Sequence, residues 1–159
     1  MRKLVVIALA GWLVSMSPAL AAFAAGTMIS LADGTTKAVE ELKTGDILAG
    51  PGGSTRTVVS LAPVAEPGVM TTITTNTGRT LTITQGHPVP VQNEGGIHLA
   101  DAVKIGDIVM TEAHVAETVT SIVDAPAGTA AYRLNAGEPG TTAKDPLFAN
   151  GVLISDEPS

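Results

Sequence analysis

The fold is decided by the stretch Glu41-Leu42-Lys43-Thr44-Gly45-Asp46-Ile47-Leu48, which returns later in the chain as Ala102-Val103-Lys104-Ile105-Gly106-Asp107-Ile108-Val109. The offset of 61 positions, from Lys43 to Lys104, needs no gap. At the same offset residues 57–60 fall on residues 118–121, and both segments are rich in the β-branched residues that favour strands. A solenoid needs at least three such units, so two copies indicate one all-β domain with pseudo-twofold symmetry.

Each copy of the repeat carries a Gly-Asp pair, Gly45-Asp46 in the first and Gly106-Asp107 in the second. Glycine allows the positive φ of a tight turn, and aspartate accepts hydrogen bonds from nearby backbone amides. We therefore interpret both aspartates as turn residues that lead into a strand, and not as a pair of catalytic carboxylates.

The rest of the chain has the pattern of many short strands separated by turns. Two threonine-rich segments flank Asn76-Thr77-Gly78 and predict a hairpin, in which alternation places Leu81 and Ile83 on one face and the threonines on the other. No segment keeps helical periodicity over three turns. The predicted strands are residues 28–31, 57–61, 70–75, 79–84 and 118–123, and single helical turns are expected at 39–42 and 101–103.

The beginning of the chain has the layout of a secretory signal peptide. Two basic residues precede an apolar run over residues 4–14, and a small-residue segment ends in Ala19-Leu20-Ala21. The apolar run is too short to span a bilayer permanently. We therefore expect a signal peptide over residues 1–21, a domain over residues 22–159, and a secreted or periplasmic location. Cleavage after Ala24 or Ala25 is the alternative, because small residues continue.

Composition excludes several classes of protein. The chain has no cysteine, so it carries no disulfide, cysteine nucleophile, cysteine-bound zinc or lipidated N-terminal cysteine. The net charge is −6, and loss of the two basic residues of the signal makes it −8, which disfavours nucleic acid and anionic membranes as partners. His87, His98 and His114 lack the close spacing of a metal site, and no Gly-x-Ser-x-Gly motif is present. We expect no cofactor, no metal and no membrane anchor.

Three blocks of the sequence, in family order, resemble the Hint (hedgehog/intein) family. Together they span residues 22–156, nearly the whole exported part. The resemblance implies an all-β, pseudo-twofold horseshoe, in agreement with the independent evidence of the repeat. The blocks are Gly26-Thr27-Met28-Ile29-Ser30-Leu31-Ala32-Asp33-Gly34 with Lys37 to Asp46; Gly78-Arg79-Thr80-Leu81 with Thr84-Gln85-Gly86-His87-Pro88; and Phe148-Ala149-Asn150-Gly151-Val152-Leu153-Ile154.

The same resemblance shows that the family's reactive groups are missing here. Active members begin with a cysteine or serine that attacks the preceding carbonyl, whereas the matching position is Ala22, whose methyl group cannot attack. The family's closing His-Asn and the acceptor residue after it correspond to Ser155, Asp156 and Glu157. The histidine upstream of the third block corresponds to Asp145.

Thr84 and His87 are the family's site residues that this sequence keeps. In the family this histidine polarises the scissile amide and protonates its nitrogen, with help from the threonine. We expect Thr84, His87 and Asp145 to form a relic site, in which His87 is a buried and hydrogen-bonded residue. The resemblance implies that residues 22–26 lie beside Thr84 and His87, with residues 145–150 on the opposite flank. The alternative is that His87 still assists hydrolysis near the N-terminus. Asn150-Gly151 predicts a turn with positive φ.

Two classes of function remain open. The first is an exported, non-catalytic binding or structural module with an unidentified protein partner. The second is an autoprocessing domain with an altered mechanism around Thr84 and His87. The expected signal peptide favours the first, because cleavage after Ala21 leaves no upstream segment to release. An exposed edge of the threonine-rich strands would let a partner add a strand.

Overall fold

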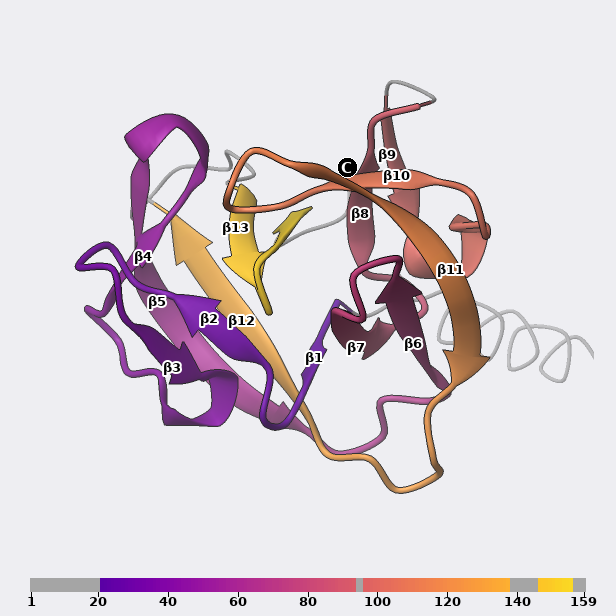
Figure 1. Ribbon diagram of the computed structural model, residues 1–159. Coiled ribbons are helices and arrows are strands. Elements are labelled where there is room, and N and C mark those ends of the chain that lie inside the picture. The colour runs from indigo at the N-terminus through magenta and orange to yellow at the C-terminus, as the bar shows by residue number, and fades with distance from the viewer. Residues whose placement is uncertain (1–20, 94–95, 138–145, 156–159) are drawn as a thin grey trace, which may run out of the picture.

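Short antiparallel strands make up nearly all of the computed structural model, which describes residues 21–93, 96–137 and 146–155 (Figure 1). No helix in these ranges is long and apolar enough to cross a membrane. The elements in chain order are β1 (Phe23–Ala24), β2 (Met28–Ser30), β3 (Thr36–Ala38), η1 (Val39–Glu41), β4 (Ile47–Ala49), η2 (Pro51–Gly53), β5 (Thr55–Val64), β6 (Met70–Thr75), β7 (Thr80–Thr84), β8 (Pro88–Val91), β9 (Gly96–Leu99), η3 (Ala100–Ala102), β10 (Ile108–Met110), β11 (Ala116–Asp124), β12 (Ala131–Gly137), β13 (Pro146–Ala149) and β14 (Val152–Ser155).

The two copies of the repeat have matching registers. In β4–β5, Leu48 lies opposite Arg56, and in β10–β11, Val109 lies opposite Glu117, 61 positions further along. The turns before them match as well, since each glycine amide of the Gly-Asp pairs donates to a strand carbonyl, at 2.9 Å in the first copy and 2.8 Å in the second. The fold is therefore all-β with an internal pseudo-twofold repeat, as the sequence predicts.

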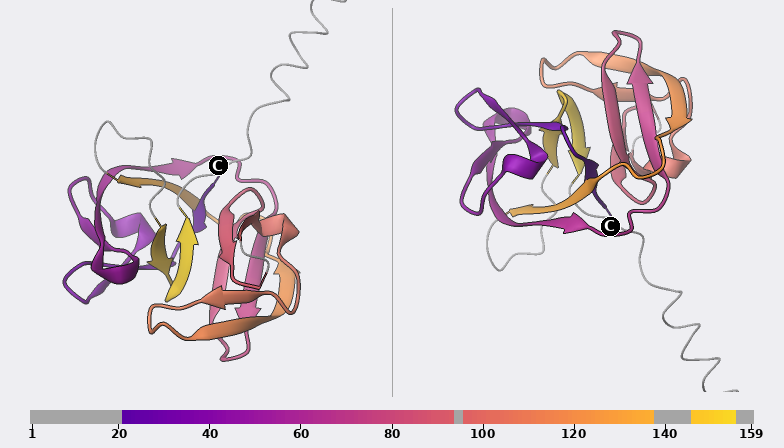
Figure 2. Two further views of the ribbon diagram at one scale, coloured as in Figure 1. Left: turned by 90° about the horizontal axis from the view of Figure 1, so that it is seen from above. Right: turned by 90° about the horizontal axis from the view of Figure 1, so that it is seen from below.

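The two copies exchange their third strands. Strand β5 of the first copy pairs with β12 of the second, and β11 of the second copy pairs with β6 of the first. The order β10-β11-β6-β7-β1-β12-β5-β4 results, with the very short β1 in the middle of the large sheet. Seen from above and below, the two halves lie on either side of the β13–β14 hairpin (Figure 2).

A continuous apolar core fills the space between the sheets. It is formed by alternate residues of the strands, as expected for strands with one buried face. Six of its side chains are large and almost fully buried: Phe23, Ile29, Leu48, Ile83, Leu147 and Ile154. A smaller cluster of Ala22, Ala24, Met70 and Ala131 lies beside it, so the start of the described chain is part of the interior.

The expected elements are present. The predicted hairpin is β6–β7, and the two predicted helical turns are the 3-10 helices η1 and η3. Strand β6 lies between β11 and β7, so neither of its edges is free. Strand β7 has β6 on one side and the two-residue β1 on the other, where only Ile83 is paired, with Phe23. Strand addition by a partner along β7 stays a prediction.

Candidate functional site

Strand β1 brings the start of the domain against the end of β7. The backbone nitrogen of Ala22 donates to Thr84 Oγ1 at 3.0 Å, and the Thr84 nitrogen donates back to the Ala22 carbonyl at 3.1 Å. Ala22 is 0% exposed and Thr84 2% exposed, so this reciprocal pair is closed to solvent. Threonine can hold such a position because its hydroxyl accepts a hydrogen bond while its methyl group packs against apolar neighbours.

His87 lies in the turn that follows β7 and is tied down by its own backbone. Its nitrogen donates to the Thr84 carbonyl at 3.0 Å, and its carbonyl accepts from the Ala100 nitrogen at 2.8 Å. The imidazole is 1% exposed, and its centroid lies 4.5 Å from that of the Phe23 ring at a tilt of 56°. The structure thus confirms that His87 is buried and hydrogen-bonded, and that it lies beside the first strand.

Burial also decides the charge of His87. Removal of water disfavours the imidazolium and lowers the pKa of His87 to about 4, although the Pro88 carbonyl, 3.3 Å from Nδ1, acts in the opposite direction. At pH 7 only about one molecule in a thousand then carries the proton. The ring is therefore a neutral hydrogen-bonding group at neutral pH, and a poor source of protons for a departing amide nitrogen.

The C-terminal flank of the site is the β13–β14 hairpin. Its tip, Asn150-Gly151, has φ of 50° and 81°, which confirms the predicted positive-φ turn. Ser155, at the place of the family's closing histidine, is buried and lies opposite Pro146. Asp145, Asp156 and Glu157 fall outside the described residues, so their position relative to Thr84 and His87 stays a prediction.

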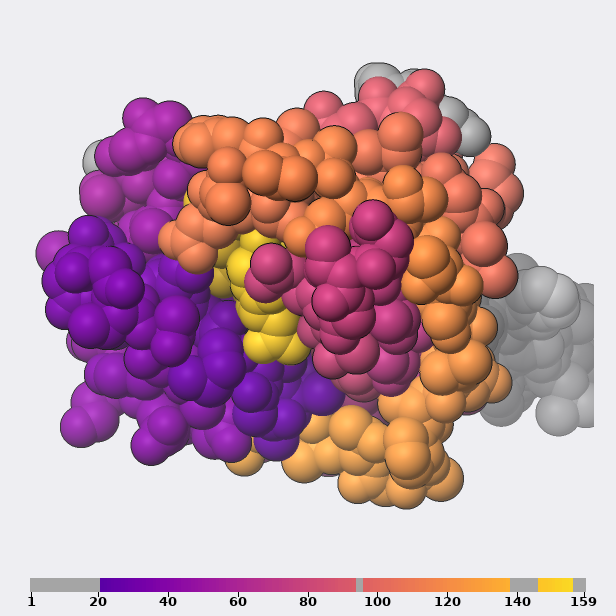
Figure 3. Space-filling view, viewed as in Figure 1, coloured from indigo at the N-terminus to yellow at the C-terminus, as the bar shows by residue number. Residues whose placement is uncertain are grey.

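Asn150 has a role that the sequence reasoning missed. Its Oδ1 accepts from the Met28 nitrogen at 2.8 Å, and its Nδ2 donates to the Thr80 carbonyl at 2.8 Å. Arg79 Nη1 in turn donates to the Asn150 carbonyl at 2.9 Å. One side chain therefore joins β2, β7 and the hairpin tip, which reaches the surface between the first strands and the β6–β7 turn (Figure 3).

Glu117 completes this network from β11. Its Oε1 accepts from Thr75 at 2.6 Å, from Thr77 at 2.9 Å and from Arg79 Nε at 3.3 Å. Burial alone would raise the pKa of Glu117, but these hydrogen bonds outweigh it and hold the pKa below its usual value. A signal was available in the sequence, because Glu117 stands two residues before the buried Val119 and strand alternation points both inward.

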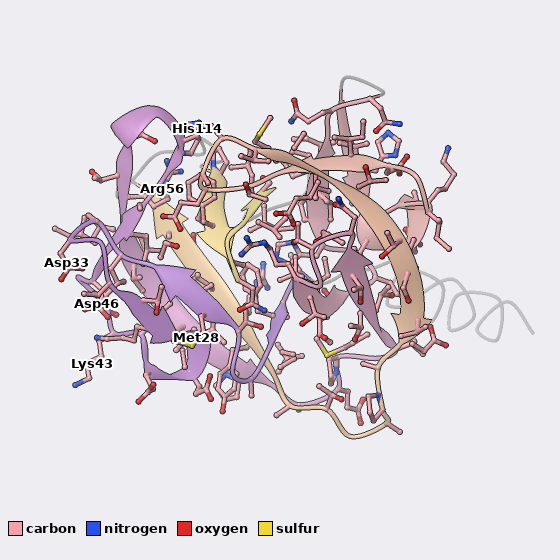
Figure 4. All side chains as sticks on the ribbon, viewed as in Figure 1. Met28, Asp33, Lys43, Asp46, Arg56 and His114 are labelled. Atoms are coloured by element: carbon pink, nitrogen blue, oxygen red, sulfur yellow. The ribbon has the colours of Figure 1, made fainter. Side chains whose placement is uncertain are left out.

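The aspartates of the repeat lie in turns. Asp46 Oδ2 accepts from the Lys43 nitrogen at 2.9 Å, and Asp107 Oδ2 accepts from the Lys104 nitrogen at 2.9 Å. Asp46 lies with Lys43 on the outer side of the first half (Figure 4). These bonds confirm that both are turn residues. Among the residues that the structure describes, no three His, Asp or Glu side chains converge as metal ligands would.

Comparison with known proteins identifies the fold. No protein-family model and no curated protein matches the sequence. Solved structures do: the gp41-1 intein has a TM-score of 0.70 at 15% identity, covering 84% of this chain and 97% of that one. A DnaB intein from Synechocystis sp. PCC 6803 has a TM-score of 0.71 at 16% identity, covering 87% and 99%. A bacterial intein-like domain from Clostridium thermocellum has a TM-score of 0.69 at 23% identity, covering 84% and 97%. The chain has the intein-like Hint fold.

Proposed function

We propose that this protein is an exported Hint-like domain whose reaction centre is assembled but has no nucleophile, and which serves as a non-catalytic binding or structural module. The observation that carries the proposal is the methyl group of Ala22. Ala22 directly precedes β1, and its backbone nitrogen donates to Thr84 Oγ1; at this position self-cleaving members of the fold need a nucleophilic side chain. A methyl group has no lone pair with which to attack the preceding carbonyl.

The state of His87 supports the same conclusion. A general acid works best when its pKa is near the working pH, and the pKa of His87 is about 4. Loss of a nucleophile alone costs about 10⁶ in kcat in a well-studied hydrolase. The missing nucleophile is therefore the main obstacle to the reaction, and the small protonated fraction of His87 slows the chemistry further at neutral pH.

The alternative is an autoprocessing domain that uses an altered mechanism. One observation favours it: the nitrogen of the peptide bond between Ala21 and Ala22 is already held at the site, because it donates a hydrogen bond to the Thr84 hydroxyl. In this mechanism a water molecule would attack the Ala21 carbonyl, and Thr84 and His87 would assist departure of the nitrogen. Intact-mass measurement, over days at 37 °C, of a fusion in which a foreign segment precedes Ala21 distinguishes the two, since only the alternative shortens the fusion without an added protease.

The decisive experiment restores the nucleophile. A fusion without the signal, in which a short foreign segment precedes Ala21, would carry Ala22→Cys and be incubated with hydroxylamine or excess thiol. Cleavage before residue 22 is expected, and His87→Ala in the same background should slow it. Ala24→Cys is the matched control, because Ala24 lies two residues further along, at the end of β1, and belongs to the same apolar cluster as Ala22.

The outcomes separate the proposals. Thiol-dependent cleavage in Ala22→Cys, and none in Ala24→Cys, would support a centre that is assembled and lacks only its nucleophile. An Ala22→Cys fusion that stays intact would mean that the scaffold has lost more than a nucleophile. Cleavage of the unmodified fusion would instead overturn the claim of inactivity, and Thr84, His87 and Asp145 would be the first residues to replace.

A further inference from the structure

Strand β1 is the link between the two halves of the large sheet. In the order β10-β11-β6-β7-β1-β12-β5-β4 it has three or more strands on either side. Phe23 lies opposite Ile83 of β7 and also opposite Tyr132 of β12. Just after the strand, the Ala25 nitrogen donates to the Ala130 carbonyl at 2.9 Å. The folded domain therefore needs residues 22–25 in place.

This placement discriminates between the possible sites of signal cleavage. Cleavage after Ala24 or Ala25 would delete Phe23, one of the largest buried side chains, and would leave β7 and β12 without the strand between them. Cleavage after Ala21 keeps the whole strand. The bond before Ala22 is itself buried in the folded domain, so a peptidase has access to it only before folding is complete.

From this geometry we propose that cleavage after Ala21 creates an α-amino group that the folded domain captures, with Thr84 as its hydrogen-bond acceptor and β1 as the strand that it anchors. The inference rests on the export included in the proposed function. It goes beyond the proposed function by naming what the retained site binds: the end of β7 binds the protein's own amino terminus.

The captured group is the uncharged amine. An amide nitrogen donates one hydrogen bond, to Thr84 Oγ1, and a neutral amine can make that same bond without added charge. In the chain that continues into Ala21, Ala22 is 0% exposed and Ala21 is 7% exposed, so both residues lie inside the domain and an ammonium group at this position gives up much of its contact with water, which is unfavourable. Folding should therefore favour the neutral form, whereas the unfolded chain titrates with the ordinary α-amino pKa of about 7.7–8.0.

The test compares two forms of the domain. One begins at Ala22, released from a cleavable fusion so that the result does not depend on export. The other carries Gly-Ser-Ala21 ahead of Ala22, so that the residue 22 nitrogen stays an amide. The other titratable groups on the elements around Ala22, namely His87, Tyr132 and Arg133, are present in both forms and cancel in the comparison.

The expected result is a pH-dependent difference in urea unfolding. The amine is neutral when folded, so its contribution to stability is present above pH 8 and is lost as the pH falls. Between pH 8 and pH 6 the unfolding constant of the Ala22 form should rise more than that of the extended form, by as much as about 40-fold if the folded amine stays neutral throughout. Thr84→Val should raise the labelling rate of this amine by small amine-reactive reagents about tenfold, the equivalent of one lost hydrogen bond. Thr82→Val, in the same strand and bonded to Thr72, should not.

Two results would overturn the inference. One is the same pH dependence in both forms, which does not require Thr84→Val to fold. The other is an exported, folded protein whose sequenced amino terminus lies at Ala25 or Gly26. By contrast, soluble cytoplasmic protein that retains Met1 would refute export, and with it part of the proposed function. The comparison of the released and extended forms would still decide whether the site binds an amine.

Discussion

His87→Gln should remove a large part of the sensitivity of this domain to acid. The imidazole lies against the Phe23 ring, away from water, while its backbone bonds to Thr84 and Ala100 fix the turn around it. Glutamine keeps a hydrogen-bonding side chain in the same place but cannot be protonated. The comparison of the two proteins across pH therefore isolates the cost of charging a buried histidine.

The magnitude follows from the two pKa values. Burial lowers the pKa of His87 from 6.5 to about 4 in the folded protein, whereas the unfolded chain keeps the ordinary value. Because the folded value is the lower one, the stabilisation is complete above pH 6.5 and is lost as the pH falls towards 4. At 1.36 kcal/mol per unit the full loss is about 3.4 kcal/mol, of which about 2 kcal/mol falls between pH 7.5 and pH 5.

The assay is urea unfolding at pH 7.5 and pH 5.0 of the native protein and of His87→Gln. The variant should lose about 2 kcal/mol less stability between these two pH values than the native protein does. His114→Asn is the control, because His114 is exposed and asparagine tolerates its φ of 62°. This control should keep the native pH dependence. Equal pH dependence in all three proteins, or an NMR titration of the His87 ring with a midpoint near 6.5, would refute the reasoning.

Three further substitutions test the turns and the hairpin tip. Asp107→Ala should cost about 2–3 kcal/mol in urea unfolding and Asp46→Ala about 1 kcal/mol, because both accept the same backbone bond but only Asp107 is buried; equal losses would contradict this. Asn150→Ala should cost about 1–2 kcal/mol, because it removes two exposed hydrogen bonds, to the Met28 nitrogen and the Thr80 carbonyl. A loss below 0.5 kcal/mol in thermal or urea unfolding, about the size of an ordinary surface change, would contradict that role.

The repeat made most of the fold predictable from the sequence, but not the exchange of strands. An offset of 61 shows which segments are alike, and β4–β5 and β10–β11 have matching registers for that reason. It does not show whether β6 and β12 each pair with the hairpin of their own copy or with that of the other copy, because both arrangements satisfy the same local pattern. The exchange of β6 and β12 depends on packing between residues far apart in the chain.

No alternation in the sequence predicts the position of β1, and only the family resemblance places residues 22–26 beside Thr84 and His87. A strand of two residues is too short to show alternation, and its neighbours in sequence are small and apolar on every side. For the same reason the alternation in β7 grouped Thr84 with the outward threonines, whereas Thr84 is 2% exposed. It is buried because β1 lies over the end of β7, which is a tertiary contact and not a property of the strand itself.

The survival of Thr84 and His87 does not require chemistry, because each supports the fold. Thr84 makes a reciprocal pair of hydrogen bonds with Ala22, and the His87 ring covers Phe23. The position of the nucleophile differs from these two, because Ala22 packs in an apolar cluster with Met70 and supports the fold without a reactive group. Under the proposed function, the parts of the centre that this chain keeps are those that hold β1 between the two halves, and the part that it lacks is one that the fold does not need.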